Sequence, residues 1–299
     1  MKLSELLWRE DLKEKFVLQK FLCTFLSCSR ETLWTDMDKE LSEDIIQKVL
    51  TAYKSYVEDK KPLEYILGHV DFFGKEFFVN EATLIPRPET EYMITAVTEY
   101  INWKLKIENW KLGENLLLDI GTGCGVLGIS VLLQNVGYFS EAIFTDYFEN
   151  ALEIAKTNYQ LLITNYEWKV SFLYSDLLDF LTSSSLKDTP SFEIKEDSNV
   201  ILVANLPYIP EEAFEQNSGD NVKKREPKPA FVGGEDGLDY YRKMFDQLHS
   251  LQPKNLTMFL EMMTWQLDIL RQAYGENFEF EEVKTFHFNI RIVKAWLKN

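Results

Sequence analysis

One short segment of the chain holds four glycines within eight residues, directly after an apolar run. The run is 116–120, a helical pattern follows at 126–134, and the glycines are Gly121, Gly123, Gly125 and Gly128. Glycine adopts positive φ without strain and lets a ligand approach the backbone closely. A strand, a glycine turn and a helix in this order predict an α/β fold that binds a nucleotide-type cofactor at the carboxyl ends of parallel strands.

After this loop, expected strands and helices alternate. Apolar runs predict strands at 142–145, 169–173, 200–204 and 256–260, and helical spacing predicts helices at 149–162, 238–251 and 264–274. Two strand-like runs close the chain with no helix between them, which favours an antiparallel hairpin at the sheet edge. We expect loops at 182–199 and 205–236. The alternation predicts a doubly wound, mainly parallel sheet.

The first part of the chain has a different pattern. Residues 1–68 have the apolar spacing of helices, with Ser42 as an expected N-cap, and contain no catalytic motif. Residues 69–85 place apolar side chains on either side of Gly74, which predicts a β-hairpin. We therefore expect a helical N-terminal domain at 1–68 that binds a partner, a hairpin linker at 69–85, and the α/β domain at 86–299.

The composition limits the partners to be expected. The chain has 32 Lys and Arg against 48 Asp and Glu, a net charge of −16. Proteins that bind nucleic-acid backbones usually carry a basic footprint, so direct nucleic-acid binding is not expected. The chain contains no run of about 18 apolar residues, so no membrane span is expected. The N-terminus lacks the apolar core of a signal peptide, so we expect a cytoplasmic protein. The spacing of the cysteines and histidines predicts neither a disulfide framework nor a metal site.

Residues near the glycine loop indicate which class of ligand it binds. Asp146 ends the next expected strand, 21 residues after Gly125, where an acidic residue can accept hydrogen bonds from ribose hydroxyls. Gly123, Gly125 and Gly128 satisfy the dinucleotide pattern GxGxxG. The longer run DxGxGxG, which begins at Asp119, instead resembles the first motif of class I S-adenosylmethionine-dependent methyltransferases. A tight turn without a ligand is a third possibility.

A second motif follows the expected strand at 200–204. It reads Asn205-Leu206-Pro207-Tyr208 and resembles the [NDS]-x-P-[YF] motif of methyltransferases that act on planar amide or aromatic nitrogens. Such an NH₂ is a poor nucleophile because its lone pair is delocalised. The Asn205 side-chain oxygen and the Leu206 carbonyl can accept its two hydrogens and orient it, while Pro207 restricts Leu206. Tyr208 can stack on the planar group. In another context these four residues would be an ordinary proline turn.

Several separate motifs together resemble the HemK/PrmC family, the N5-glutamine methyltransferases of peptide chain release factors. Besides the two motifs above, they are PLEYILG at 62–68, LIPRPETE at 84–91, EPKPA at 226–230 and GGEDGL at 233–238. The resemblance implies a class I (Rossmann-like) methyltransferase fold with S-adenosylmethionine as cofactor. It also implies a class I peptide chain release factor as partner, methylated on the glutamine of its Gly-Gly-Gln motif.

The resemblance further implies roles for individual residues, and none for a metal. The residues implied to bind the cofactor are Gly121, Thr122, Gly123, Cys124, Gly125, Asp146, Asp176, Leu177 and Asn205. Within this set, Asp146 would bind the ribose, and Asp176 and Leu177 would border the adenine. The residues implied to hold the glutamine amide are Asn205, Leu206, Pro207 and Tyr208.

Three other functions stay open. Most family members have proline where this chain has Leu206, and NLPY is the spelling of rRNA adenine dimethyltransferases, which favours adenine-N6 methylation of RNA or DNA. The glycine pattern also suits a nicotinamide-dependent oxidoreductase, although that function leaves the turn at 205–208 unexplained. A non-catalytic cofactor-binding partner protein would fit two further departures. Met262 replaces the glycine that usually follows Glu261, and Thr285 stands where an aspartate closes the pattern.

Overall fold

The computed structural model describes residues 1–107, 115–166, 168–181, 194, 198–283 and 290–298, without the side chains of residues 220 and 221. Thr285 and most of the expected loop at 182–199 lie outside the described residues. Within the described ranges, no helix is both long enough and apolar enough to cross a membrane.

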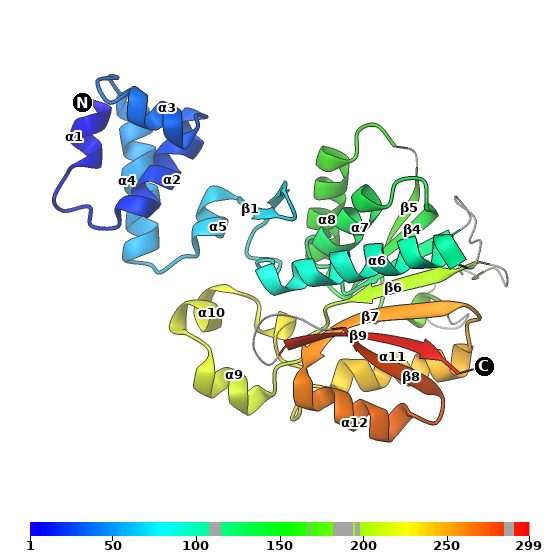
Figure 1. Cartoon of the computed structure of the whole chain (residues 1–299). Helices are drawn as coiled ribbons and strands as arrows, with labels where there is room; N and C mark the ends of the chain where they lie inside the picture. Colours follow the sequence, from blue (N-terminus) through cyan, green and yellow to red (C-terminus); the bar gives the residue numbers. More distant parts are fainter. Residues whose placement is uncertain (108–114, 167, 182–193, 195–197, 284–289, 299) are drawn as a thin grey trace.

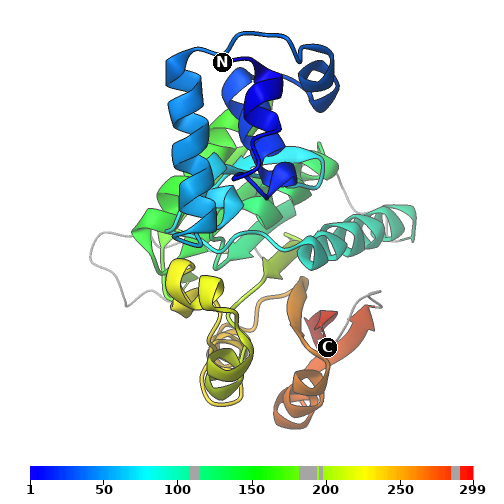
Figure 2. The same ribbon diagram turned by 90° about the vertical axis from the view of Figure 1, so that its left-hand side faces the viewer.

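Five short helices open the chain. They are α1 (Leu3–Leu7), α2 (Lys15–Leu26), α3 (Arg30–Thr35), α4 (Glu43–Val57) and α5 (Leu63–Leu67). The Ser42 hydroxyl accepts a hydrogen bond from the Ile45 amide at 3.3 Å, so it caps α4 as expected. The apolar faces of α1 to α4 enclose a core of their own, which includes the fully buried Leu6, Leu18 and Phe21. These helices stand together at one end of the molecule (Figures 1 and 2).

A two-stranded antiparallel hairpin follows, made of β1 (His69–Phe72) and β2 (Lys75–Phe78). Asn158 of α8 (Glu149–Leu162) holds β2 in place. Its side-chain oxygen accepts from the Phe78 amide at 2.7 Å, and its nitrogen donates to the Phe78 carbonyl at 2.9 Å and the Cys124 carbonyl at 2.8 Å. One fully buried side chain thus connects the hairpin to the glycine loop.

Seven strands form a single sheet in the order β5-β4-β3-β6-β7-β9-β8. The strands are β3 (Asn115–Ile120), β4 (Phe139–Asp146), β5 (Lys169–Tyr174), β6 (Val200–Ala204), β7 (Leu256–Met263), β8 (Phe278–Val283) and β9 (Ile290–Leu297). Strands β3 to β7 are parallel, while β9 and β8 add an antiparallel pair at one edge. The sheet confirms the predicted α/β class and the closing hairpin. Because the strand order reverses at β3, a ligand crevice is expected at the carboxyl ends of β3 and its neighbours.

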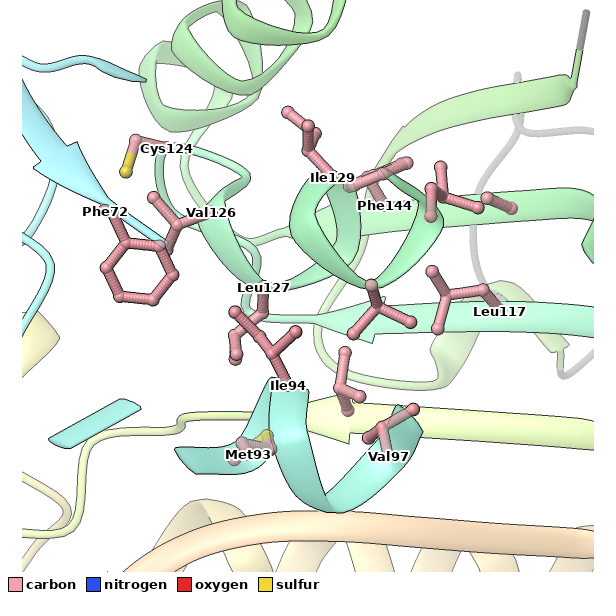
Figure 3. Packing of buried hydrophobic residues seen from close by; sticks show 14 of the residues in the cluster. Phe72, Met93, Ile94, Val97, Leu117, Cys124, Val126, Leu127, Ile129 and Phe144 are labelled. Atoms are coloured by element: carbon pink, nitrogen blue, oxygen red, sulfur yellow. The ribbon is translucent and has the colours of Figure 1, made fainter. Parts of the chain in front are cut away.

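Helices cover both faces of the sheet (Figure 1). Helices α6 (Glu91–Ile107), α7 (Val126–Gln134) and α8 pack on one face, and α11 (Asp239–Leu251) and α12 (Thr264–Tyr274) pack on the other. Figure 3 shows the first face, where Ile94 and Val97 of α6 and Leu127 and Ile129 of α7 gather around Leu117 of β3. Ile94 and Val97 are three residues apart and so lie on one side of α6, whereas α7 is buried at every position from Val126 to Leu132.

The segment 205–236 is not the continuous loop that the sequence suggested. It contains the short helices α9 (Glu211–Asn217) and α10 (Asp220–Arg225) and the 3₁₀ turn η3 (Lys228–Ala230). Further 3₁₀ turns are η1 (Pro88–Thr90), before α6, and η2 (Asp179–Leu181), after β5. Helices of one or two turns have too few residues to show a helical period. Strand β7 also runs three residues beyond its expected end at 260, which puts Glu261 inside the sheet.

Candidate active site

The carboxyl ends of four neighbouring parallel strands meet at one edge of the sheet. The glycine loop follows β3, Asp146 ends β4, Asn205 follows β6, and Glu261 lies near the end of β7. A cavity of about 610 Å³ lies there, and residues from the segments 82–90 and 227–230 form part of its wall. The predicted residues that line it are Gly121, Thr122, Gly123, Cys124, Asp146, Asp176, Leu177, Asn205, Leu206 and Pro207. Within the described structure, Gly125 and Tyr208 stand outside this lining.

The glycine loop depends on backbone conformations that other residues rarely adopt. The φ angles of Gly121, Gly123 and Gly125 are 67°, 56° and 86°. A Cβ added to Gly121 would lie 2.9 Å from the Leu206 side chain, and one added to Gly125 would lie 2.9 Å from Ile129. At Gly123, an added Cβ would meet no described atom within 4 Å. The loop therefore packs closely against the chain at two of its glycines and leaves room for a ligand at the third.

Asp119 supports the loop from inside the sheet. Its Oδ2 accepts hydrogen bonds from the Thr122 hydroxyl at 2.6 Å and from the Gly128 amide at 2.9 Å. Burial raises the pKa of Asp119 to about 7, although both hydrogen bonds favour the carboxylate. A Cβ on Gly128 would overlap the Phe144 ring at 2.4 Å. The fourth glycine thus allows α7 to pack closely on the sheet.

Asp146 is fixed by the backbone on both sides of its carboxylate. Oδ2 accepts from the Gly123 amide at 2.9 Å, and Oδ1 accepts from the Phe148 amide at 2.9 Å. Burial raises the pKa of Asp146, while these amides lower it. A carboxylate oxygen can accept a second hydrogen bond. Asp146 therefore presents a rigid acceptor pair to the cavity, as a ribose diol requires.

The end of β5 forms another wall. Asp176 makes an ion pair with Lys243 of α11, and its carbonyl accepts from Gln247 Nε2 at 3.2 Å. Leu177 has a φ of 56° and a buried side chain. Leu177 and Tyr240 give this end of the cavity an apolar surface. Such a surface suits one face of a flat ring.

Side chains of α11 and α12 hold the proline turn after β6 in place. Gln266 Nε2 donates to the Tyr208 carbonyl at 2.8 Å. The Tyr241 hydroxyl makes a short hydrogen bond to the Glu261 carbonyl and lies 3.5 Å from the Leu206 carbonyl. A hydroxyl has a single hydrogen, so the Leu206 carbonyl keeps its capacity to accept.

Two glycines of the GGEDGL segment let the chain approach this turn closely. A Cβ on Gly233 would lie 2.3 Å from the Pro207 carbonyl oxygen, and one on Gly237 would lie 2.0 Å from the Tyr208 carbonyl oxygen. A side chain at either glycine would therefore displace the turn.

A buried carboxyl lies beneath the turn. Glu261 is 1% exposed, and its Oε1 accepts from the Tyr208 hydroxyl at 3.0 Å. Asn205 Nδ2 donates to the Thr90 hydroxyl oxygen at 3.1 Å. Burial raises the pKa of Glu261 to about 7, hydrogen bonding by Thr90 and Tyr208 opposes this rise, and the neighbouring Glu89 adds to it. The site therefore has a polar cluster under its floor, formed by Thr90, Asn205, Tyr208 and Glu261.

An ion pair with a buried carboxylate joins two family motifs into a single wall of the cavity. Arg87 of the LIPRPETE segment donates to Glu226 Oε1 at 2.7 Å, and the Ile85 amide donates to Glu226 Oε2 at 3.1 Å. The Glu226 side chain is 3% exposed. The EPKPA segment, which begins at Glu226, and the LIPRPETE segment both line the cavity.

Sequence reasoning did not assign functional roles to Thr90, Asn158, Glu226 and Glu261. The one local signal was Glu261, an acidic residue in the otherwise apolar strand LTMFLEMM. The other three are polar residues whose partners lie 34 or more positions away. Across the described residues, no group of three or more His, Cys, Asp and Glu side chains is placed to hold a metal ion.

Comparison with solved structures places the fold. The N-terminal domain of human METTL16 has a TM-score of 0.51 and 15% identity, covering 97% of this chain and 96% of that chain. The hMettl16 catalytic domain in complex with MAT2A 3′UTR hairpin 6 has a TM-score of 0.50 and 14% identity, covering 85% and 82%. At these identities the likeness concerns the fold alone. No protein-family model matches the chain.

Comparison with curated proteins is more specific. A "release factor glutamine methyltransferase" of Bacillus anthracis is 34% identical over 258 residues, 85% of this chain and 82% of the relative. Its namesakes from Bacillus cereus and Francisella tularensis are 33% identical over 88% of the chain and 28% identical over 96% of it, covering 84% and 92% of their own lengths. The fold, the cavity at the strand ends and these relatives define an S-adenosylmethionine-dependent methyltransferase with the class I fold. The chain belongs to the release factor glutamine methyltransferase family, as its HemK/PrmC motifs predicted.

Proposed function

We propose that this enzyme transfers the methyl group of S-adenosylmethionine to the side-chain amide nitrogen, N5, of the glutamine in the Gly-Gly-Gln motif of a class I peptide chain release factor. One observation carries the proposal. Asn205 and Leu206 line the same cavity as the glycine loop and Asp146. The name of the relatives supports the substrate.

The cofactor is assigned to the part of the cavity between the glycine loop and the end of β5. Asp146 would accept from its ribose hydroxyls, Asp176 and Leu177 would border its adenine, and Asn205 would face its reactive end. The loop residues assigned to it are Gly121, Thr122, Gly123, Cys124 and Gly125, of which Gly125 acts through the shape of the loop. When bound, the cofactor supplies an electrophilic methyl group on a sulfonium sulfur.

The glutamine amide is held by two acceptors. Asn205 Oδ1 accepts one hydrogen of the amide NH₂ and the Leu206 carbonyl accepts the other. This arrangement aims the nitrogen at the methyl group and favours pyramidalisation as the C–N bond forms. Pro207 restricts the backbone of Leu206 so that its carbonyl stays in place. The nitrogen becomes acidic once it is methylated and then loses a proton, so no strong base is required.

Tyr208 has a different role in this proposal from the one expected of it. Its hydroxyl donates to Glu261, and its carbonyl accepts from Gln266. Burial raises the pKa of Tyr208, so the hydroxyl remains a donor at neutral pH. We therefore assign Tyr208 to holding the turn in shape rather than to stacking on the substrate.

The helical domain at 1–68 is assigned to recognition of the release factor, with the hairpin at 69–85 as its linker. It has its own apolar core, and no side chain of α1 to α4 lines the described cavity. Helix α10 approaches this region, since Arg225 donates to the Asp59 carbonyl at 2.6 Å. Release factors act at the ribosome, so the enzyme is assigned to the cytoplasm.

The test is to incubate the protein with isotope-labelled S-adenosylmethionine and a purified class I release factor, then locate the label by mass spectrometry. We expect one methyl group on the Gly-Gly-Gln glutamine. A release factor with Gly-Gly-Ala in that position is the matched control and should stay unlabelled. Label on adenine in added RNA, with none on the glutamine, would overturn the proposal in favour of adenine-N6 methylation.

A further inference from the structure

The Asn205 side chain can fit its site in two ways. A side-chain amide has an oxygen end and a nitrogen end of nearly equal size, and only hydrogen-bond partners distinguish them. In the structure Nδ2 donates to the Thr90 hydroxyl oxygen at 3.1 Å. Thr90 ends η1 and is 2% exposed. The partner that sets the direction of the Asn205 amide is therefore a buried hydroxyl, which can itself either donate or accept.

The Glu261 carboxyl lies next to this hydroxyl. Its Oε1 accepts from the Tyr208 hydroxyl at 3.0 Å, whereas its Oε2 is buried and has no hydrogen-bond partner among the described residues. Thr90 and Asn205 are polar side chains beside this carboxyl, and their donor groups lower its pKa. The other titratable groups that face it are Glu89 of η1 and Tyr241 of α11.

The direction of each hydrogen bond in this cluster follows from the carboxylate. A carboxylate accepts and cannot donate. Thr90 has one hydroxyl hydrogen, so if it points at Glu261, only lone pairs remain for Asn205. Asn205 must then turn its NH₂ toward Thr90, and its Oδ1 is left toward the cavity. With the opposite orientation, Asn205 would present hydrogens to the hydrogens of the substrate amide.

We propose that Glu261 and Thr90 are positioning residues that fix which end of the Asn205 amide faces the methyl acceptor. The inference rests on the proposed function, because it matters only if the acceptor is an NH₂ that needs an oxygen opposite it. Neither residue touches the substrate. Both act through Asn205, and Glu261 also acts through Tyr208.

The experiment measures methylation of the release factor by four full-length variants and the wild type. Thr90→Val removes the hydroxyl at almost constant volume, Thr90→Ser retains it, and Glu261→Gln replaces an obligate acceptor with a group that can also donate. Thr257→Val is the matched control. Thr257 is buried on the same strand as Glu261, but its hydroxyl bonds Tyr100 at the other end of β7.

We expect kcat to fall roughly 10- to 100-fold in Thr90→Val and Glu261→Gln, as for other residues that orient a contacting group. The KM for S-adenosylmethionine should change less than about twofold. Thr90→Ser should recover most of the activity, and Thr257→Val should match the wild type. The wild-type kcat should fall as the pH drops through about 7, where Glu261 takes up a proton. That step should be absent from the profile of Glu261→Gln.

Each other outcome has a defined meaning. If the wild type does not label the glutamine at all, the proposed function fails before this inference is tested. If the wild type is active and Thr90→Val keeps full kcat, orientation through Thr90 is wrong, whatever Glu261→Gln does. Equal losses in Thr90→Val and Thr90→Ser would mean that packing, rather than the hydroxyl, was responsible, and would also overturn the inference.

Discussion

At the scale of single residues, Asp146 combines two tasks. Its carboxylate accepts one backbone amide on each oxygen and so shapes the glycine loop, and it also lines the cavity. Asp146→Ala should therefore weaken S-adenosylmethionine binding by roughly 1.5–3 kcal/mol, the range for a hydrogen bond to a charged group. Titration calorimetry measures this directly. Unchanged affinity in a folded variant would show that the ribose binds elsewhere.

Asn205 should matter for chemistry far more than for cofactor binding. Asn205→Ala removes the acceptor assigned to the substrate amide and should cost about 2–4 kcal/mol of transition-state stabilisation, read from kcat/KM with the release factor. Asn205→Asp is the informative comparison, because it keeps an acceptor but loses the nitrogen that bonds Thr90 at 3.1 Å. It also puts a second carboxyl beside Glu261, so it should be poor as well. Near-normal turnover of the alanine variant would exclude the amide-holding mechanism.

The buried carboxyl of Glu261 should cost stability at neutral pH. Burial raises its pKa to about 7, so between its ordinary value and pH 7 the folded state binds more protons than the unfolded state. The contribution of this group to stability therefore falls as the pH rises through that window. Glu261→Gln should match the wild type at about pH 4.5 and exceed it by roughly 1–3 kcal/mol at pH 8. Urea unfolding at the two pH values gives the difference, and a variant less stable at pH 8 would contradict the sign.

At the scale of elements, the segment from α9 to α11 packs closely against the proline turn. Gly237 has a φ of 75°, and a Cβ there would come within 2.0 Å of the Tyr208 carbonyl oxygen. Gly237→Ala combines left-handed strain with overlap, so it should cost roughly 2–4 kcal/mol and lower kcat by displacing the turn.

Gly137→Ala is the control for that variant. Gly137 has a similar φ of 82°, but an added Cβ would meet no described atom within 4 Å. It should cost only about 1–2 kcal/mol, the strain itself, and leave kcat unchanged. Urea unfolding and initial rates separate the two effects. Equal losses in both variants would mean that the contact with the turn has no consequence.

The elements themselves could be predicted where the pattern is local. The bounds of α7, α8, β6 and α12 agree with the sequence expectation residue for residue, because each has a clear period or an unbroken apolar run. Helices α9 and α10 could not be found in this way, since six or seven residues contain less than two turns. The same distinction between local and non-local patterns applies to the site. Motif residues 121–124, 146 and 205–207 could be placed at the cavity from sequence. Thr90 of η1 and Glu261 of β7, which form the polar cluster with Asn205, could not, because no local pattern connects them.

At the scale of the whole molecule, the helical domain should be separable from the chemistry. Its core is distinct from the cores of the sheet. Helix α5 should be retained, because Tyr65 packs in the sheet core and its hydroxyl bonds the Thr83 carbonyl. Deleting residues 1–61 should therefore lower kcat/KM for the intact release factor tenfold or more while leaving S-adenosylmethionine affinity within about twofold.

A short Gly-Gly-Gln peptide supplies the control for the deletion. It lacks the rest of the release factor, so full-length and truncated enzyme should methylate it at the same rate. If the truncated enzyme also methylates the intact release factor at the full-length rate, the helical domain has no part in recognition.

Asn158 couples the position of the hairpin to that of the glycine loop. Its single amide occupies both backbone groups of Phe78 and the carbonyl of Cys124, at distances of 2.7–2.9 Å. A flexible linker would let the helical domain move without affecting the glycine loop. The hairpin is instead hydrogen-bonded to Asn158, which also bonds that loop. The hairpin and the glycine loop are joined by Asn158 and by the apolar core that both share. We therefore expect the hairpin and that loop to move together.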